Sequence, residues 1–222
     1  MRPAPPLARR GRALLALAWA WSLAPAAESR PEPLFDGRSL GGWVSSGFEG
    51  DRGARVERDF EPGRAAIVIE AGTTLGGVTS TLGSRLPRMD YEVAFEAMRV
   101  AGGDFFGALT FPVENTACTL VVGGWGGTVV GISNVNGIDA SGNETTREME
   151  FADRRWYRIR VRVTPGLVEA WIDDTKVVEL PTAGRRLSLR PGDIHKARPL
   201  GITTYMTKAA VRGITLTRLP RG

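Results

Sequence analysis

The stretch from Arg155 to Leu180 constrains the fold most, because its apolar residues alternate with charged ones. From Tyr157 to Val163 the odd-numbered residues are apolar and the even-numbered ones are arginines. A period of two is that of a half-buried antiparallel strand. Turn-forming residues then follow at Pro165-Gly166 and at Asp173-Asp174-Thr175. The pattern predicts three strands joined by two hairpins, at 157–163, 167–173 and 176–180.

Shorter strand-like segments fill the chain before this stretch. From Arg55 onward they alternate with glycine-rich turns, and no helical pattern of useful length interrupts them. Glycine pairs fall at segment ends without a fixed period, which argues against a repeat protein. Many short strands with such turns predict an all-β sandwich or barrel. The expected strands are 65–70, 77–82, 90–99, 105–113, 116–123 and 128–133.

The N-terminus has the pattern of a signal peptide. Four arginines before residue 13 precede an apolar run from Ala13 to Ala24, and Pro25-Ala26-Ala27 supplies the small residues of a cleavage site. The run is shorter than the roughly 20 apolar residues that a membrane-spanning helix needs. We therefore expect residues 1–27 to be removed, and the protein to be exported to the periplasm or the extracellular space without a membrane span.

The leader also accounts for most of the positive charge. The chain has 29 basic and 24 acidic residues, and four of the arginines precede Glu28, so the remainder is close to neutral. No basic run with interleaved aromatic residues follows, and we expect no nucleic-acid partner. Residues 28–222 suffice for a single domain with a sizeable core. Cys118 is the sole cysteine and lies in an apolar run, so we expect a buried core residue rather than a nucleophile.

Several segments resemble a known family. The opening LFDGRSLGGW at 34–43 is similar to the motif that begins the 3-keto-disaccharide hydrolase family. The segments Asp90–Glu96, Arg155–Tyr157 and Leu200–Leu216 resemble later strands of that family. The resemblance implies a two-sheet antiparallel jelly-roll sandwich of the concanavalin A-like lectin and glucanase type.

The resemblance also implies a reaction, the cleavage of sugars already oxidised at C3. The ketone acidifies the proton on C2, so a base can remove it and the glycosidic oxygen leaves by elimination, followed by hydration. The chain would then be an exported hydrolase acting on an oxidised disaccharide or glycan that a sugar oxidoreductase supplies. Such chemistry needs one base rather than the carboxylate pair of ordinary glycosidases, and the Glu-x-Asp-x-x-Glu pattern of laminarinase-type glucanases is absent from the sequence.

Three residues are candidates for the base. Glu96 lies on the polar face of the strand at 91–99, Asp104 follows the Gly102-Gly103 turn, and His195 is the sole histidine, a residue type that titrates near neutral pH. The alternative for each is an ordinary solvated residue.

Three further residues are candidates for substrate binding. Trp125 stands between two glycine pairs, and together with Tyr205 it offers an aromatic face to a sugar, although core packing explains Trp125 equally well. Arg147 can pair with a substrate oxyanion or with a neighbouring carboxylate.

The loop at 134–144 is dense in oxygen ligands. Asn136 and Asp139 are its candidate calcium ligands, although the spacing is not that of an EF-hand and a hydrogen-bonded turn without metal is the alternative. No other cofactor is expected.

One departure from the family pattern supports a second hypothesis about function. Where the family commonly shows Gln-x-His, this chain has Thr203-Thr204-Tyr205-Met206. The alternative to an enzyme is therefore a non-catalytic carbohydrate-binding or surface-attachment domain on the same fold. A structural domain that packs against a partner and binds no sugar is a third alternative.

Overall fold

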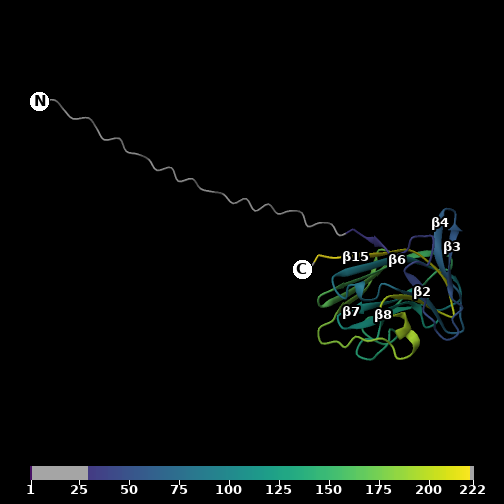
Figure 1. Ribbon diagram of the computed structural model, residues 1–222. Coiled ribbons are helices and arrows are strands. Elements are labelled where there is room, and N and C mark those ends of the chain that lie inside the picture. The colour runs from purple at the N-terminus through teal and green to yellow at the C-terminus, as the bar shows by residue number, and fades with distance from the viewer. Residues whose placement is uncertain (2–29, 221–222) are drawn as a thin grey trace.

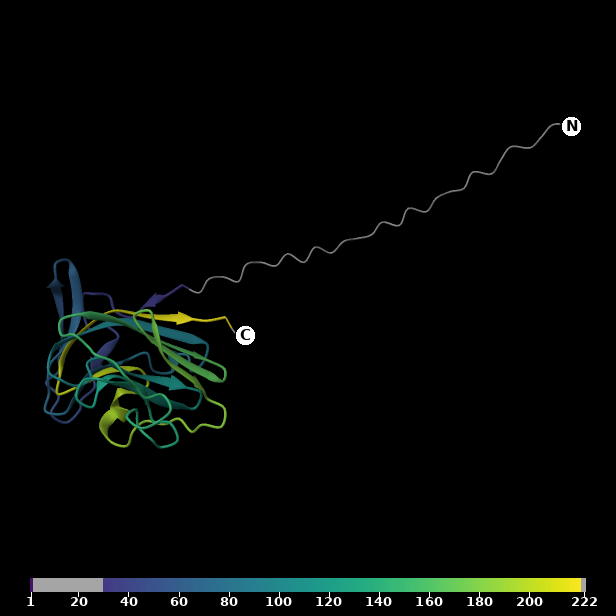
Figure 2. The same cartoon turned by 180° about the vertical axis from the view of Figure 1, so that it is seen from behind.

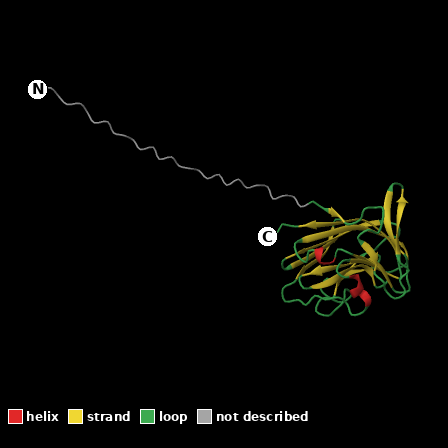
Figure 3. Cartoon of the chain, viewed as in Figure 1, coloured by secondary structure: helices red, strands yellow, loops and turns green. Residues whose placement is uncertain are grey.

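The computed structural model describes Met1 and residues 30–220, and nearly all of the regular secondary structure in this part of the chain is β-strand (Figures 1 and 3). The leader predicted at 1–27 lies outside the described residues except for Met1, so the signal peptide stays a prediction. None of the helices in the described part of the chain is long and apolar enough to cross a membrane.

The strands form two antiparallel sheets that pack face to face. The first sheet has the order β13 (Thr175–Pro181), β12 (Leu167–Ile172), β11 (Trp156–Thr164), β6 (Tyr91–Ala101), β15 (Lys208–Arg218), β4 (Arg64–Ile69) and β3 (Ala54–Glu61), and β1 (Glu32–Pro33) pairs with β15. The second sheet has the order β10 (Arg147–Glu148), β9 (Val129–Ser133), β8 (Thr116–Gly124), β7 (Ala108–Val113), β14 (Gly201–Tyr205), β5 (Leu75–Ser80) and β2 (Trp43–Ser45). The predicted two-sheet antiparallel sandwich is confirmed.

The three strands predicted from the alternating stretch are β11, β12 and β13, and the predicted bounds of each strand are confirmed to within two residues. Tyr157, Ile159, Val161 and Val163 are all buried, as the period of two requires. The segment predicted at 105–113 forms a strand only from Ala108, because Phe106 packs into the core and Gly107 lies against Ala97 of β6.

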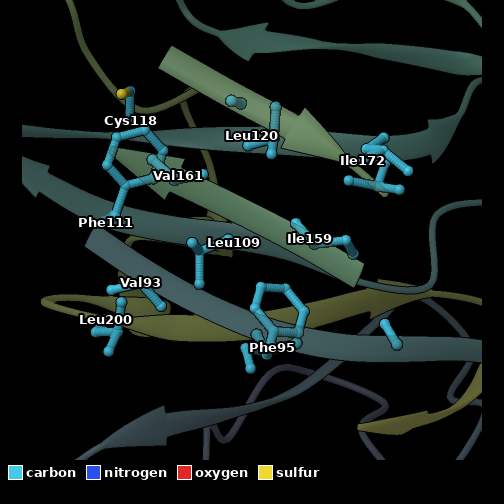
Figure 4. Packing of buried hydrophobic residues seen from close by; sticks show 14 of the residues in the cluster. Val93, Phe95, Leu109, Phe111, Cys118, Leu120, Ile159, Val161, Ile172 and Leu200 are labelled. Atoms are coloured by element: carbon cyan, nitrogen blue, oxygen red, sulfur yellow. The ribbon is translucent and has the colours of Figure 1, made fainter. Parts of the chain in front are cut away.

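The core lies between the two sheets (Figure 4). Phe95 of β6 and Ile159 of β11 lie on the inner face of the first sheet, and Leu109 of β7 and Leu120 of β8 lie on the inner face of the second. Cys118 is part of this cluster, as predicted, and burial raises the pKa of its thiol far above the ordinary value. A thiol held protonated in this way is not a nucleophile.

Within residues 30–220 the chain also forms two short 3₁₀ helices, η1 (Gly83–Arg85) and η2 (Asp193–Ala197). Figures 1 and 2 show η2, in yellow-green, on the side of the second sheet that faces away from β6 and β15. The segment between β13 and η2 pairs with the loop after β9, since Asn134 and Ser188 exchange backbone hydrogen bonds of 2.6 and 3.2 Å. This pairing fixes the two loops to each other beside the outer face of the second sheet.

Candidate functional site

The outer face of the second sheet carries a cavity of about 410 Å³, which we call the first cavity. Its lining comes from the sheet and from the segment before and within η2: Leu75, Asp104, Phe105, Ala108, Thr119, Val121, Trp125, Ser133, Arg190, Pro191, Asp193, Ile194 and Tyr205. This volume lies within the range of about 300–1,000 Å³ that is usual for small-molecule sites.

The floor of the first cavity consists of small side chains. Along β8, Cys118 and Leu120 point into the core, so Thr119 between them points outward, and Ala108 of β7 and Ser133 of β9 point the same way. The hydroxyl of Thr119 lies 2.8 Å from that of Thr110 on the neighbouring strand. Because the side chains of Ala108, Thr119 and Ser133 are small, the loops above this part of the sheet leave room for a ligand.

Aromatic side chains form one wall of the first cavity. Trp125 has a φ of 49°, follows Gly124 and precedes Gly126, and is 40% exposed. The rings of Phe105 and Tyr205 lie 5.9 Å apart between centroids. Partly exposed aromatic faces beside a polar floor are suited to the C–H faces of a sugar ring.

Asp104 holds this wall in place. Its Oδ1 accepts a hydrogen bond of 2.8 Å from the backbone N–H of Phe105, and its Oδ2 accepts one of 3.0 Å from that of Gly126. Its own N–H donates to the Thr207 hydroxyl at 3.2 Å. One carboxylate oxygen therefore binds the main chain next to Trp125, and the other binds the main chain of Phe105.

Residues 190–194 form another part of the lining, and they include the charged residues Arg190 and Asp193. The Arg190 guanidinium carbon lies 5.6 Å from the centre of the Trp125 ring, and Arg190 Nη1 lies 3.9 Å from Asp139 Oδ2. Asp193 Oδ2 accepts a hydrogen bond of 3.1 Å from Lys196 Nζ. The Lys196 ammonium and the backbone N–H of Glu49 hold the pKa of Asp193 below its ordinary value.

A second cavity of about 370 Å³ adjoins the first. It is lined by Glu49, Thr73, Thr74, Leu75, Asp193 and Tyr205. Leu75, Asp193 and Tyr205 line both cavities. The two cavities therefore adjoin at these three residues, and we call the two cavities together the groove.

Three of the predicted site residues, Asp104, Trp125 and Tyr205, meet in the first cavity. His195 lies beside them in η2 but lines neither cavity. Its Nδ1 is 2.8 Å from the carbonyl oxygen of Gly192, so Nδ1 carries the donated hydrogen and Nε2 is the acceptor in the neutral ring.

Glu96 and Arg147 do not belong to this groove, which corrects their placement in one site with Asp104 and Trp125. Glu96 faces outward as its alternation with Phe95 requires, but β6 belongs to the first sheet. There its Oε2 accepts a hydrogen bond of 2.7 Å from Arg212. Arg147 is exposed on the edge strand β10, and its Nη1 donates to the Thr146 carbonyl at 3.3 Å.

The predicted calcium ligands are engaged in loop hydrogen bonds. Asn136 Oδ1 accepts one of 2.9 Å from the backbone N–H of Arg186, and Asp139 Oδ1 accepts two from Ser141, at 3.1 and 2.6 Å. Across residues 30–220, no group of three or more His, Cys, Asp and Glu side chains is arranged to hold a metal ion. The geometry of this loop gives the calcium prediction no support.

Sequence reasoning did not identify Arg190, Asp193 and Glu49 as site residues. Arg190 and Asp193 belong to the turn-rich segment around His195. Charged residues next to the Pro191-Gly192 turn are the sequence feature that could have indicated a site there. Glu49 comes from a loop far away in the sequence, and only the pairing of β2 with β5 brings it near Thr74.

Known structures share this fold at low sequence identity. The carbohydrate-binding module CBM66 from Bacillus subtilis is 11% identical with a TM-score of 0.52, and the match covers 79% of this chain and 95% of that one. The Emp47p carbohydrate recognition domain is 13% identical with a TM-score of 0.50, covering 89% and 100% of the two chains. The apo Crh5 transglycosylase is 9% identical with a TM-score of 0.50, covering 89% and 85%. At such identities the similarity shows the concanavalin A-like jelly roll alone.

The sequence itself identifies the family. A search of curated proteins found no significant match. The family described as the 3-keto-alpha-glucoside-1,2-lyase-like domain matches residues 30–217, which is nearly all of the described chain. The chain therefore belongs to the 3-keto-alpha-glucoside-1,2-lyase-like family, a carbohydrate-related family, as the motif at 34–43 predicted.

Proposed function

We propose that this protein binds glycosides already oxidised at C3 in the groove and cleaves them by elimination followed by hydration. The observation that carries the proposal is the first cavity, in which an aromatic wall, a guanidinium and two carboxylates surround a floor of small residues. Family membership supplies the reaction class, and the groove supplies groups suited to each step.

Binding of the sugar rests on the wall and the floor. The exposed ring of Trp125 and the ring of Tyr205 offer surfaces to the C–H faces of a pyranose, and the Thr119 and Ser133 hydroxyls line the floor below. Asp104 keeps Trp125 in position through Gly126. The oxidised ring would lie on the floor of the first cavity, beside Trp125 and Arg190.

Asp193 is the proposed base. Its carboxylate takes the proton from C2, the electron pair forms the enolate, and the Arg190 guanidinium stabilises the negative charge on the C3 oxygen. The enolate then expels the glycosidic oxygen from C1, and that oxygen takes a proton from a water molecule. The hydroxide that remains adds to C1 of the C1–C2 double bond, and Asp193 gives its proton back to C2, which completes a net hydrolysis and restores the carboxylate.

Asp193 suits this step better than Asp104. Both oxygens of Asp104 accept main-chain N–H groups, whereas Asp193 is held by the flexible side chain of Lys196 and by the main chain of Glu49. The lowered pKa of Asp193 keeps it ionised at neutral pH. An aspartate without a strongly raised pKa can remove a proton next to a carbonyl when the enolate is stabilised.

A carbohydrate-binding domain without catalytic activity is the second candidate. The hydrogen bonds that lower the pKa of Asp193 also weaken it as a base, and this observation favours binding alone. Tyr205 and its neighbours occupy the positions where the family commonly shows Gln-x-His.

The test is to incubate the purified protein with methyl 3-keto-α-glucoside and with its unoxidised parent. The proposal expects release of methanol from the keto sugar alone, with kcat reduced roughly 100-fold in Arg190→Met because the enolate loses its charged partner. Glu148→Gln, an exposed change on β10, is the control. Binding of both sugars without turnover would establish the second candidate instead.

Export and substrate supply complete the proposal. The leader at 1–27 would direct the chain to the periplasm or the extracellular space, and N-terminal sequencing of the exported protein would test cleavage after Ala27. Because the substrate carries a C3 ketone, a sugar oxidoreductase acting earlier must supply it.

A further inference from the structure

The polar loop at 134–144 lies beside the groove, and one of its carboxylates contacts the guanidinium that lines the first cavity. Asp139 Oδ2 lies 3.9 Å from Arg190 Nη1, while Asp139 Oδ1 accepts hydrogen bonds from Ser141. Resting on the proposed function, we propose that Asp139 is a positioning residue, which holds the Arg190 guanidinium where the enolate oxygen forms. The loop then supports the group that stabilises the enolate.

The guanidinium of Arg190 has partners on two sides. Its carbon lies 5.6 Å from the centre of the Trp125 ring, and its Nη1 forms the ion pair with Asp139. The Arg190 side chain is 58% exposed, and an arginine so exposed has many rotamers when it has no partner. The ring and the carboxylate together restrict it to a small region beside the cavity floor. A charged group already in place when the enolate forms costs no reorganisation during the reaction.

The Asn143 side chain fixes the main chain that carries Asp139. Its Nδ2 lies 2.7, 3.1 and 2.8 Å from the carbonyl oxygens of Ile132, Ile138 and Asp139, so its two hydrogens are shared among three acceptors. Its Oδ1 accepts hydrogen bonds from the backbone N–H of Thr145 at 2.9 Å and from the Thr145 hydroxyl at 2.6 Å. Because Ile132 belongs to β9, these bonds attach the loop to the second sheet.

The loop also packs directly on the sheet beside the first cavity. Ala140 is fully buried in a small cluster with Val121 and Val129, and Phe105 packs against this cluster. A Cβ added at Gly131 of β9 would lie 3.2 Å from the Ala140 carbonyl oxygen, so the missing side chain lets the loop approach the strand. Val121 and Phe105 also line the first cavity. The contacts that hold the loop in place are therefore contacts with the cavity wall itself.

Arg190 comes from a segment that is paired with this loop. The backbone N–H of Asn136 donates to the Arg186 carbonyl at 2.8 Å, and Asn136 Oδ1 accepts from the Arg186 N–H at 2.9 Å. Glu144 and Arg185 form a further ion pair between the same two segments, and both residues lie outside the two cavities. The fold thus sets the separation between the loop and the segment, and the Glu144–Arg185 pair offers a matched control.

A double-mutant cycle tests whether Asp139 acts through Arg190. Asp139→Asn removes the charge and keeps an oxygen for Ser141. It should lower kcat on methyl 3-keto-α-glucoside roughly tenfold with little change in KM, because the displaced guanidinium is needed only for the charge that develops in the transition state. Added to Arg190→Met, the same change should cause no further loss of kcat, since the group that it positions is absent.

Three further variants complete the test. Asp139→Glu keeps a carboxylate and should recover most of the loss, and Glu144→Gln should leave kcat unchanged. Asp139→Ser also removes the carboxylate and should repeat the result of Asp139→Asn, so the conclusion does not depend on the folding of one variant. Urea unfolding of each variant separates a loss of stability from a loss of kcat.

The outcomes separate this inference from the proposed function. Wild-type kcat in Asp139→Asn, an equal loss in Glu144→Gln, or additive losses in the double variant would overturn the positioning role, while turnover of the keto sugar by the wild type upheld the proposed function. Absence of turnover by the wild type would overturn both.

Discussion

The outer faces of the two sheets differ in what they do with their polar residues. On the first sheet, Arg160 and Arg162 both pair with Glu92, and the Arg160 guanidinium carbon lies 4.0 Å from the centre of the Trp171 ring. On the second sheet, the outward residues Ala108, Thr119 and Ser133 are small, and the loops leave a cavity above them. The charged residues on the outer face of the first sheet pair with one another, whereas the outer face of the second sheet has a cavity lined by charged groups that a ligand can contact.

In a second cluster on the first sheet, the charged groups also pair with one another. Arg212 donates to Glu96 at 2.7 Å and to Glu61 at 2.6 Å, and it stacks on the ring of Trp156 at 3.8 Å. Trp156 Nε1 donates to Glu61 at 2.8 Å, and this bond together with Arg212 lowers the pKa of Glu61. In this protein, the charged residues on the outer face of the first sheet therefore do not mark a ligand site. The candidate site lies where loops cover small outward residues of the second sheet.

The largest expected effect compares one carboxylate from each face. Asp193→Asn should reduce kcat on keto sugars about 10²- to 10⁴-fold, because the base is lost while its shape is kept. Glu96→Gln on the first sheet should change kcat less than about twofold, because Glu96 lies outside the groove. Steady-state kinetics measures kcat of both variants, with circular dichroism as a folding control. Equal losses of kcat in the two variants would contradict the assignment of the reaction to the second sheet.

The next effect concerns stability and should spare binding. Arg212→Ala should lower the free energy of unfolding by about 2 kcal/mol, which lies between the effect of an exposed ion pair and that of a buried network. The reason is that the side chain of Arg212 is 10% exposed, while its two carboxylate partners are more than a third exposed. Urea unfolding measures the loss. A change in sugar affinity at unchanged stability would contradict the assignment of this cluster to the fold.

A smaller effect is expected from adding the same bulk to each face. Ala108→Leu places a larger side chain on the floor of the first cavity and should weaken sugar binding roughly tenfold. Ala94→Leu makes the same change on β6, on the outer face of the first sheet, and should leave affinity unchanged. Calorimetric titration distinguishes them, and undiminished affinity in Ala108→Leu would mean that the ligand lies elsewhere.

The smallest effect is a shift in pH dependence. Lys196 lowers the pKa of Asp193 from its ordinary value of 3.8. Asp193 is therefore a carboxylate at every pH above that value, and its ion pair with Lys196 stabilises the folded protein there. Both the charge and this stabilisation are lost only as the pH falls through the lowered pKa. Turnover should therefore persist to below about pH 4, and Lys196→Ala should move its acid limb upward. An acid limb in the neutral pH range, where histidine side chains titrate, would instead favour His195 as the base.

The fold could be predicted because its signals are local. The alternation at 157–163 and the turn residues after it fix strands and buried faces without reference to distant parts of the chain. The alternation of Glu96 with Phe95 correctly placed Glu96 on an outer face. It could not show that β6 lies in the sheet opposite the groove, because that depends on the order of all the strands.

The site was only partly predictable for the same reason. Trp125 could be identified from its flanking glycines, which permit its positive φ. Arg147 was chosen for its nearness in sequence to a polar loop, whereas Arg190, far away in the sequence, is the arginine that lies over Trp125. The crossing of residues 183–197 over the second sheet decides this, and that crossing depends on pairing between two distant loops.

The most direct test of the central claim is a crystal structure of Asp193→Asn soaked with maltose oxidised at C3 of its non-reducing ring. We expect ligand density over the second sheet, with the oxidised ring in the first cavity beside Trp125 and Arg190. Density over Trp156 and Arg212 on the first sheet, with an empty groove, would contradict it.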